Sequence, residues 1–153
     1  MTSTPAPPTT SLPTGKVLIS AAALFTAAGA FAADWNETHI YNPTWPPHAK
    51  FHNAQTMNLA VLASGLSLWQ LWGPGRADRP RLRRAVLSAS LFWLTQAPAA
   101  FYPGAALTDP EDPWRAPSVA GVQLNQVTGI AAVLAPLLAV GYALEVRRLR
   151  RSA

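Results

Sequence analysis

Four long apolar runs, separated by polar segments, constrain the fold of this chain more than any other feature. The runs cover residues 16–34, 51–72, 85–103 and 118–144. Each is close to or above the ~20 residues that an α-helix needs to cross the hydrocarbon core of a membrane. None alternates apolar and polar residues as a membrane-spanning β-strand must. The sequence therefore predicts an all-α fold, a four-helix transmembrane bundle over residues 16–146.

The composition also favours a membrane protein over a soluble one. Hydrophobic residues make up 50% of the chain and charged residues only 12%, whereas a soluble domain typically carries about 25% charged residues. Residues 1–15 are rich in Pro, Thr and Ser, and we expect them to form a disordered tail. Cysteine is absent, which excludes disulfides and thiolate metal ligands.

The first apolar run has a second interpretation as a secretory signal peptide, with the small residues near its end as a cleavage site. A signal peptide normally begins with several positive charges, but here Lys16 stands alone after a proline-rich segment. Three further apolar runs also follow. We therefore favour an uncleaved first membrane span.

Lysine and arginine are distributed unevenly between the loops, and this bias predicts the orientation. Ten of the twelve lie at residue 16, within residues 75–84, or after residue 146. Both termini are accordingly expected in the cytoplasm, with 147–153 as a basic cytoplasmic tail attracted to anionic lipid. The location predicted is a cell membrane, most simply a bacterial plasma membrane. Nucleic acid is excluded as a partner, because the basic segments carry no aromatic residues or recognition motif.

The second run begins with an unusual collection of polar and aromatic residues. Pro46 and Pro47 suit the first turn of a helix, where a missing amide hydrogen costs nothing. The helix is therefore predicted to start near Pro46, with Thr44 or Trp45 as its cap.

Four polar side chains of this helix share one face. At 100° per residue, His48, His52, Gln55 and Thr56 cover an arc of about 100°, and Asn53 and Asn58 flank it. Polar groups are costly to bury in hydrocarbon, so this face is expected to point into the bundle or a water-filled cavity.

Further polar residues are expected at the same depth on the other helices. Gln96 lies on the third run, and Gln123 and Gln126 share a face of the fourth. Asp34 and Glu37, at the end of the first run, would share a face if that helix continued. Together these residues predict a polar pocket that opens away from the cytoplasm.

Acid–base chemistry on a hydrophobic substrate is the leading functional hypothesis. A carboxyl group near hydrocarbon holds its proton more readily and could protonate a double bond, while a histidine accepts a proton. Aromatic rings could stabilise a cationic intermediate. The candidate catalytic residues are Asp34, Glu37, His39, His48 and His52. The candidate substrate-binding residues are Trp35, Tyr41, Trp45, Phe51, Asn53, Gln55, Trp93, Gln96, Gln123 and Gln126.

Other functions fit the same residues. No cofactor is required, but a divalent metal could be held by His39, His48 and His52, with Glu37 or Asp34 completing the site. The chain could equally be a non-catalytic accessory subunit or a small-molecule transporter, in which the polar loop only closes the bundle. Small residues on the first and third runs would permit a homo-oligomer.

The stretch from residue 39 to residue 52 resembles a family of small four-span integral membrane proteins without an established activity. The shared pattern H-x-x-N-P-x-W-P-x-H-A-K-F-H corresponds here to His39, Asn42, Pro43, Trp45, Pro46, His48, Ala49, Lys50, Phe51 and His52. More loosely, the chain is similar to small membrane terpene cyclases and sterol isomerase-like proteins. That analogy implies protonation-initiated cyclisation or isomerisation of an isoprenoid or lipid-like substrate.

Overall fold

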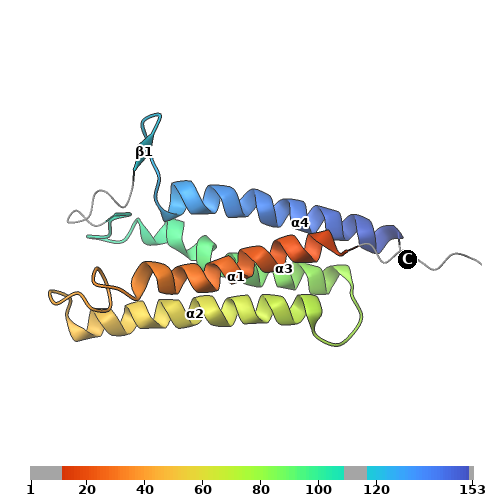
Figure 1. Cartoon of the computed structure of the whole chain (residues 1–153), viewed down its shortest axis with the longest axis horizontal. Helices are drawn as coiled ribbons and strands as arrows, with labels where there is room; N and C mark the ends of the chain where they lie inside the picture. The colour runs from red at the N-terminus through yellow and green to blue at the C-terminus, as the bar shows by residue number, and fades with distance from the viewer. Residues whose placement is uncertain (1–11, 109–116, 152–153) are drawn as a thin grey trace, which may run out of the picture.

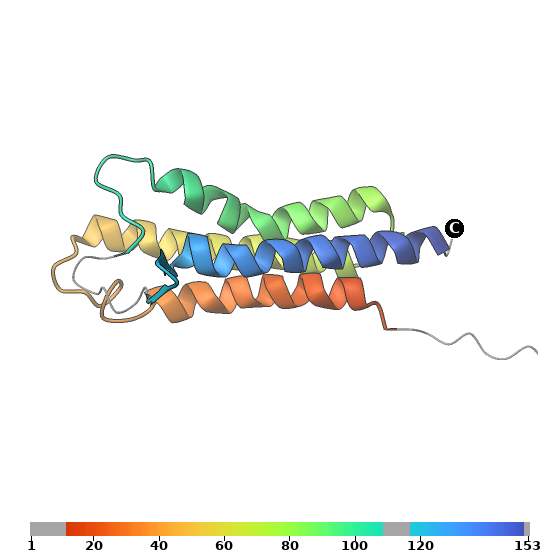
Figure 2. The ribbon, with the colours of Figure 1, turned by 90° about the horizontal axis from the view of Figure 1, so that it is seen from above.

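The computed structural model describes residues 12–108 and 117–151. Within these residues the chain forms four α-helices that lie side by side and run alternately up and down (Figures 1 and 2). They are α1 (Thr14–Asp34), α2 (Pro47–Trp72), α3 (Arg79–Ala99) and α4 (Ala132–Arg151). A π-helical segment, η2 (Gln126–Ala131), runs directly into α4. The mostly helical architecture that the sequence predicts is thus present.

The bundle has two different ends. The terminal end holds the beginning of α1, the end of α4 and the connection between α2 and α3 (Figure 1). The loop end holds residues 35–46, the segment after α3 and the segment before η2. All of the polar residues singled out from the sequence lie in the half of the bundle near the loop end.

Prolines and short polar side chains set the helix starts. α2 begins at Pro47, with Pro46 in the extended cap position, so the cap is one residue later than the predicted Trp45. Proline fits there because its fixed φ matches a helix and it has no amide hydrogen to leave unpaired. At α3 the Asp78 side chain accepts a hydrogen bond of 2.8 Å from the backbone N–H of Arg81, a conventional N-cap.

The fourth apolar run departs from the prediction of a continuous helix over residues 118–144. Its first part is a two-stranded hairpin, β1 (Ser118–Val119) and β2 (Val122–Gln123), with Ser118 opposite Gln123. The helix starts only after Asn125, whose side chain accepts hydrogen bonds from two backbone N–H groups of the first turn. Ala120 and Gly121 form the turn at positive φ, 50° and 79°. Gly121 makes this turn possible because glycine adopts a positive φ without strain. The Asn125 cap then determines the residue at which the helix begins.

The first and last helices extend into the segments that were predicted to be tails. The basic segment expected as a tail from residue 147 is helical as far as Arg151, because α4 continues through it. Most of the predicted N-terminal tail, residues 1–11, lies outside the described residues, and Thr14 already belongs to α1.

Small residues make the contacts between helices. The buried face of α1 includes Ala22 and Ala23, and that of α2 includes Ala60 and Ala63. The closest approach is between α1 and α4, where a Cβ placed on Gly15 would lie 2.5 Å from the carbonyl oxygen of Gly141. Only glycine allows backbones to come this close, and small residues at helix contacts are characteristic of membrane bundles.

Large apolar side chains point outward rather than into the core. Phe25, Leu62, Leu94 and Val133, one from each long helix, are 49%, 61%, 59% and 67% exposed. Among the described residues, two helices are long and apolar enough to cross a membrane, Thr14–Asp34 and Gln126–Arg151. Each long helix therefore exposes large apolar side chains on its outer face.

Candidate functional site

A large open cavity of about 1010 Å³ lies at the loop end. Its walls come from α1, the loop 35–46, α2, α3, the segment after α3, the segment before η2, and η2 itself. Figure 2 shows the last turns of α3 lying apart from α4 at this end. Ligand pockets commonly have volumes of about 300–1,000 Å³, so this cavity has room for a substantial organic molecule.

Most of the wall is aromatic or aliphatic. Phe25 and Leu59 line it from α1 and α2, and Phe92 and Trp93 from α3. The indole N–H of Trp93 donates a 2.8 Å hydrogen bond to the Thr26 hydroxyl in the core. Because this bond satisfies its only polar group, Trp93 faces the cavity as an apolar, electron-rich ring.

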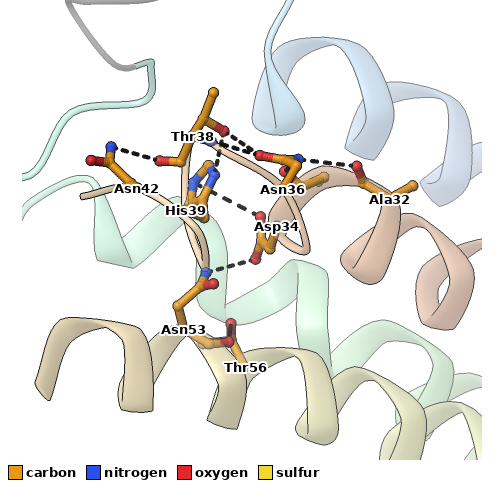
Figure 3. A network of polar contacts seen from close by, with 9 residues as sticks. Ala32, Asp34, Asn36, Thr38, His39, Asn42, Asn53 and Thr56 are labelled. Atoms are coloured by element: carbon orange, nitrogen blue, oxygen red, sulfur yellow. Dashed lines mark hydrogen bonds and ion pairs between the residues drawn. The ribbon is translucent and has the colours of Figure 1, made fainter. Parts of the chain in front are cut away.

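One end of the cavity is polar and centres on Asp34 (Figure 3). Oδ2 of Asp34 accepts a 2.9 Å hydrogen bond from the side-chain amide of Asn53, which comes from the second turn of α2. Oδ1 lies 3.9 Å from Nε2 of His39. The side chains of Asp34 and His39 are 19% and 29% exposed. A carboxylate and an imidazole are thus held side by side where α1 ends.

Hydrogen bonds within the loop hold the His39 ring beside Asp34. The Asn36 side-chain oxygen accepts from both the backbone N–H and the hydroxyl of Thr38, at 2.9 and 2.7 Å. Nδ1 of His39 lies 2.8 Å from the same hydroxyl oxygen and is hydrogen-bonded to it. Because Nδ1 is engaged by the loop, Nε2 is the ring nitrogen that faces the Asp34 carboxylate.

The loop that carries His39 is built by two repeats of the pattern Asn-x-Thr. Asn42 accepts from the backbone N–H and hydroxyl of Thr44, as Asn36 does from Thr38. The Asn42 amide also donates to the Thr38 carbonyl at 3.2 Å. These are Asx turns, which fix a loop without regular secondary structure. Asn36, Thr38, Asn42 and Thr44 were not predicted as site residues, although the repeated spacing is visible in the sequence.

Trp45 and Gln96 complete the arrangement around the pair. Trp45 packs edge-on to the His39 ring, with 5.0 Å between centroids, and also lines the cavity. Gln96 lines it from α3, and its buried side-chain oxygen has no hydrogen-bond partner among the described residues. Such an oxygen in a native protein is normally satisfied by water or a ligand. From the fourth run, Gln126 lines the cavity but Gln123 does not.

Several other predicted residues lie away from the cavity. Glu37 is exposed on the loop, because α1 ends at Asp34 and does not place the two carboxylates on one helical face. Trp35 and Tyr41 are both exposed, and the Trp35 indole donates a 2.6 Å hydrogen bond to the Tyr41 hydroxyl. Their place on the exterior matches interfacial aromatic residues.

The polar face of α2 is also exposed. His48, Phe51, His52 and Gln55 form a cluster on the surface of its first turns, and none of the four lines the cavity. Asn53, which flanks that face, is the residue of this helix that reaches Asp34. Most of the stripe predicted to point inward therefore points outward. Thr56 is the member of the stripe that lines the cavity, and Asn53 from its flank reaches inward to Asp34.

A metal site with three protein ligands is not formed in the part of the chain that the structure describes. No three His, Asp or Glu side chains there come together around a common point. His39 pairs with Asp34 instead of joining His48 and His52.

Comparison with known proteins places the chain in a family. Residues 18–153 match the model of a family of unknown function (DUF6640), so the chain belongs to that family. No curated protein and no solved structure matches the chain. The family assignment agrees with the resemblance inferred from the sequence but supplies no activity.

Proposed function

We propose that all four long helices cross a membrane. The support is the distribution of side chains: small residues face the helix contacts, and large apolar residues face outward on every long helix. α2 and α3 are less apolar overall because α2 begins with the polar loop-end residues and α3 begins with arginines. The Lys/Arg bias then puts the terminal end in the cytoplasm and the cavity on the opposite side.

Acid–base chemistry on a hydrophobic small molecule is the function that fits the cavity best. The observation that carries this proposal is the Asp34–His39 pair, a carboxyl group and an imidazole held side by side at the polar end of an otherwise apolar cavity. Sites that perform proton transfer need an acid and a base with a fixed geometry and restricted water. Asp34 takes the role of acid, with His39 as its partner. Glu37, His48 and His52 take no part, because they lie outside the cavity.

The reaction proposed is an isomerisation or cyclisation that begins with protonation of a carbon–carbon double bond. The proton held by the pair adds to one alkene carbon, and the positive charge forms on the other. The faces of Trp45 and Trp93 and the free oxygen of Gln96 are placed to stabilise that charge. Loss of a proton from a neighbouring carbon back to the pair gives a shifted double bond or a ring. At the end of the cycle the pair has regained the proton that it donated, and the product carries no added charge.

Asp34→Asn tests the proposal, with Glu37→Gln as the matched control. Both substitutions replace a carboxylate by an amide near the same loop, but only Asp34 lines the cavity. Lipids extracted from cells that express each variant would be separated by chromatography and identified by nuclear magnetic resonance, because isomers have equal mass. We expect the product to fall by about 10²-fold or more in Asp34→Asn and to be unchanged in Glu37→Gln. Identical lipid profiles for the wild type and Asp34→Asn would refute the proposal.

A further inference from the structure

The exposed cluster on α2 has a geometry that the proposed chemistry does not use. It consists of His48, Phe51, His52 and Gln55 on the first turns of the helix, outside the cavity. The Nε2 atoms of His48 and His52 lie 3.0 Å apart. Two exposed histidines one turn apart have many rotamers available, so convergence of these two nitrogen atoms requires a specific cause.

Ring contacts and a hydrogen bond hold the two imidazoles in place. Phe51 stacks on His48 with 6.0 Å between centroids and an interplanar angle of only 6°. The His48 and His52 rings meet edge to face, 4.5 Å apart at 80°. Gln55 fixes the other side of His52, because its side-chain oxygen lies 3.2 Å from Nδ1. Each histidine ring therefore has a neighbour that restricts its rotation.

The contact with Gln55 also determines the tautomer of His52. An amide oxygen only accepts, so Nδ1 of His52 must carry the hydrogen. In the neutral ring the lone pair is then on Nε2, directed at His48. This is the usual arrangement around metal-ligating histidines, in which the second ring nitrogen donates to an oxygen that orients the ring and raises its basicity.

The ligand type indicates the class of metal. With metal–nitrogen bonds of about 2.0–2.1 Å, two nitrogen ligands of one ion lie about 2.9–3.3 Å apart. The two Nε2 atoms, which are hydrogen-bonded to each other at 3.0 Å, already lie within that range. Among divalent ions that bind nitrogen ligands, Cu²⁺ binds most tightly.

We propose that His48 and His52 form a bidentate site for Cu²⁺ at the mouth of α2, with water as the remaining ligands. The metal takes the place of the proton that the two Nε2 atoms otherwise share. His48 then carries its hydrogen on Nδ1, and Gln55 keeps His52 in the ligating tautomer. The site is independent of the cavity and of the chemistry proposed there.

Copper titration of the untagged full-length protein in detergent micelles tests this site. Calorimetry and electron paramagnetic resonance with Cu²⁺ alone are expected to show one tight ion per chain with two nitrogen ligands. His48→Ala and His52→Ala should each weaken binding at least tenfold, and Gln55→Leu by about tenfold through loss of ring orientation. His39→Ala, which removes the remaining histidine, should leave the affinity unchanged.

Three results would overturn the assignment. The first is Cu²⁺ affinity in the double variant His48→Ala, His52→Ala equal to that of the wild type. The second is a resonance spectrum with fewer than two nitrogen ligands. The third is Zn²⁺ binding more tightly than Cu²⁺, which would contradict the metal preference expected of two nitrogen ligands.

Discussion

The two ends of the bundle are built in opposite ways. At the terminal end α1 and α4 touch through their backbones at Gly15 and Gly141, and the adjoining pocket holds only about 100 Å³. At the loop end the helices enclose a cavity of about 1010 Å³ whose floor includes a π-helical segment. π-helical turns are less stable than α-helix and frequently mark functional sites. The contrast suggests that one end supplies stability and the other end supplies chemistry.

Charged residues show the same division. At the terminal end Arg81 donates to the carbonyl groups of Trp69, Gly73 and Pro74, and so completes the C-terminus of α2. Lys16 donates to the Leu71 carbonyl at 2.7 Å. These cations bind carbonyl oxygens in the last turn of α2 and directly after it. At the loop end, by contrast, Asp34 and His39 face a cavity.

The largest loss of stability is expected from Arg148→Ala at the terminal end. Glu145 is only 1% exposed, and Arg148 donates to its Oε1 at 2.8 Å. Removal of the guanidinium leaves a buried carboxylate without its main partner, which costs about 3–5 kcal/mol. Thermal unfolding in detergent would measure the loss.

Two controls make the result specific. Arg150→Ala removes an exposed arginine of the same helix and should change stability by no more than about 0.5 kcal/mol. Glu145→Gln, added to Arg148→Ala, removes the isolated charge and should recover part of the loss. Equal effects of Arg148→Ala and Arg150→Ala would show that the buried pair does not stabilise the terminal end.

Gly141→Ala should have the next largest effect. An added Cβ would lie 2.9 Å from Cγ1 of Ile19 and 3.0 Å from the Gly15 carbonyl oxygen. Overpacking of this kind costs about 1–3 kcal/mol. Gly65→Ala is the matched control, because nothing lies within 4 Å of a Cβ at that helical position. It should stabilise the protein slightly through helix propensity, and destabilisation of equal size in both variants would disprove close packing at Gly141.

The helices were predictable from sequence because they depend on apolar runs and on residues next to each other in the chain. Pro46 and Pro47 correctly predicted the start of α2. The hairpin before η2 was missed because residues 118–144 are mostly apolar and were assigned to one continuous helix. Periodicity and hydropathy do not show that Gly121 forms a turn and that Asn125 caps a later helix.

The site was only partly predictable, since it depends on how the helices rotate about their axes. The polar residues of α2 were recognised, but the side of the helix that faces α1 was assigned to His48 and His52 instead of Asn53. Neighbouring residues differ by about 100° around a helix. Rotation of α2 about its axis by that angle would turn His52 toward α1 in place of Asn53. Contacts between distant segments, such as Asn53 with Asp34, fix that rotation and leave no signal in local sequence.

Thr38→Val tests whether the loop end contributes to product formation more than to stability. It removes the hydroxyl that links Asn36 to His39 while keeping the size of the side chain. Stability should fall by about 1 kcal/mol, the typical value of one hydrogen bond. Product formation should fall much further, because Nδ1 of His39 loses its hydrogen-bond partner and the ring loses its orientation toward Asp34. Thr44→Val, in the second Asx turn, is the control with a similar stability loss and little loss of product. An equal loss of product in both variants would mean that the loop acts only as scaffold.

The smallest change in stability is expected from Gln96→Met. Because the buried Gln96 oxygen has no partner among the described residues, an apolar side chain of similar length should leave stability within about 0.5 kcal/mol of the wild type or raise it slightly. Ser67→Ala removes another buried oxygen without a partner in the described chain, this time on α2 and outside the cavity. Both variants should unfold near the wild-type temperature, but only Gln96→Met should reduce product. If Gln96→Met instead lowered the free energy of unfolding by more than about 1 kcal/mol, the Gln96 oxygen would be accepting a hydrogen bond that stabilises the fold. The loop end would then contribute to stability, as the terminal end does.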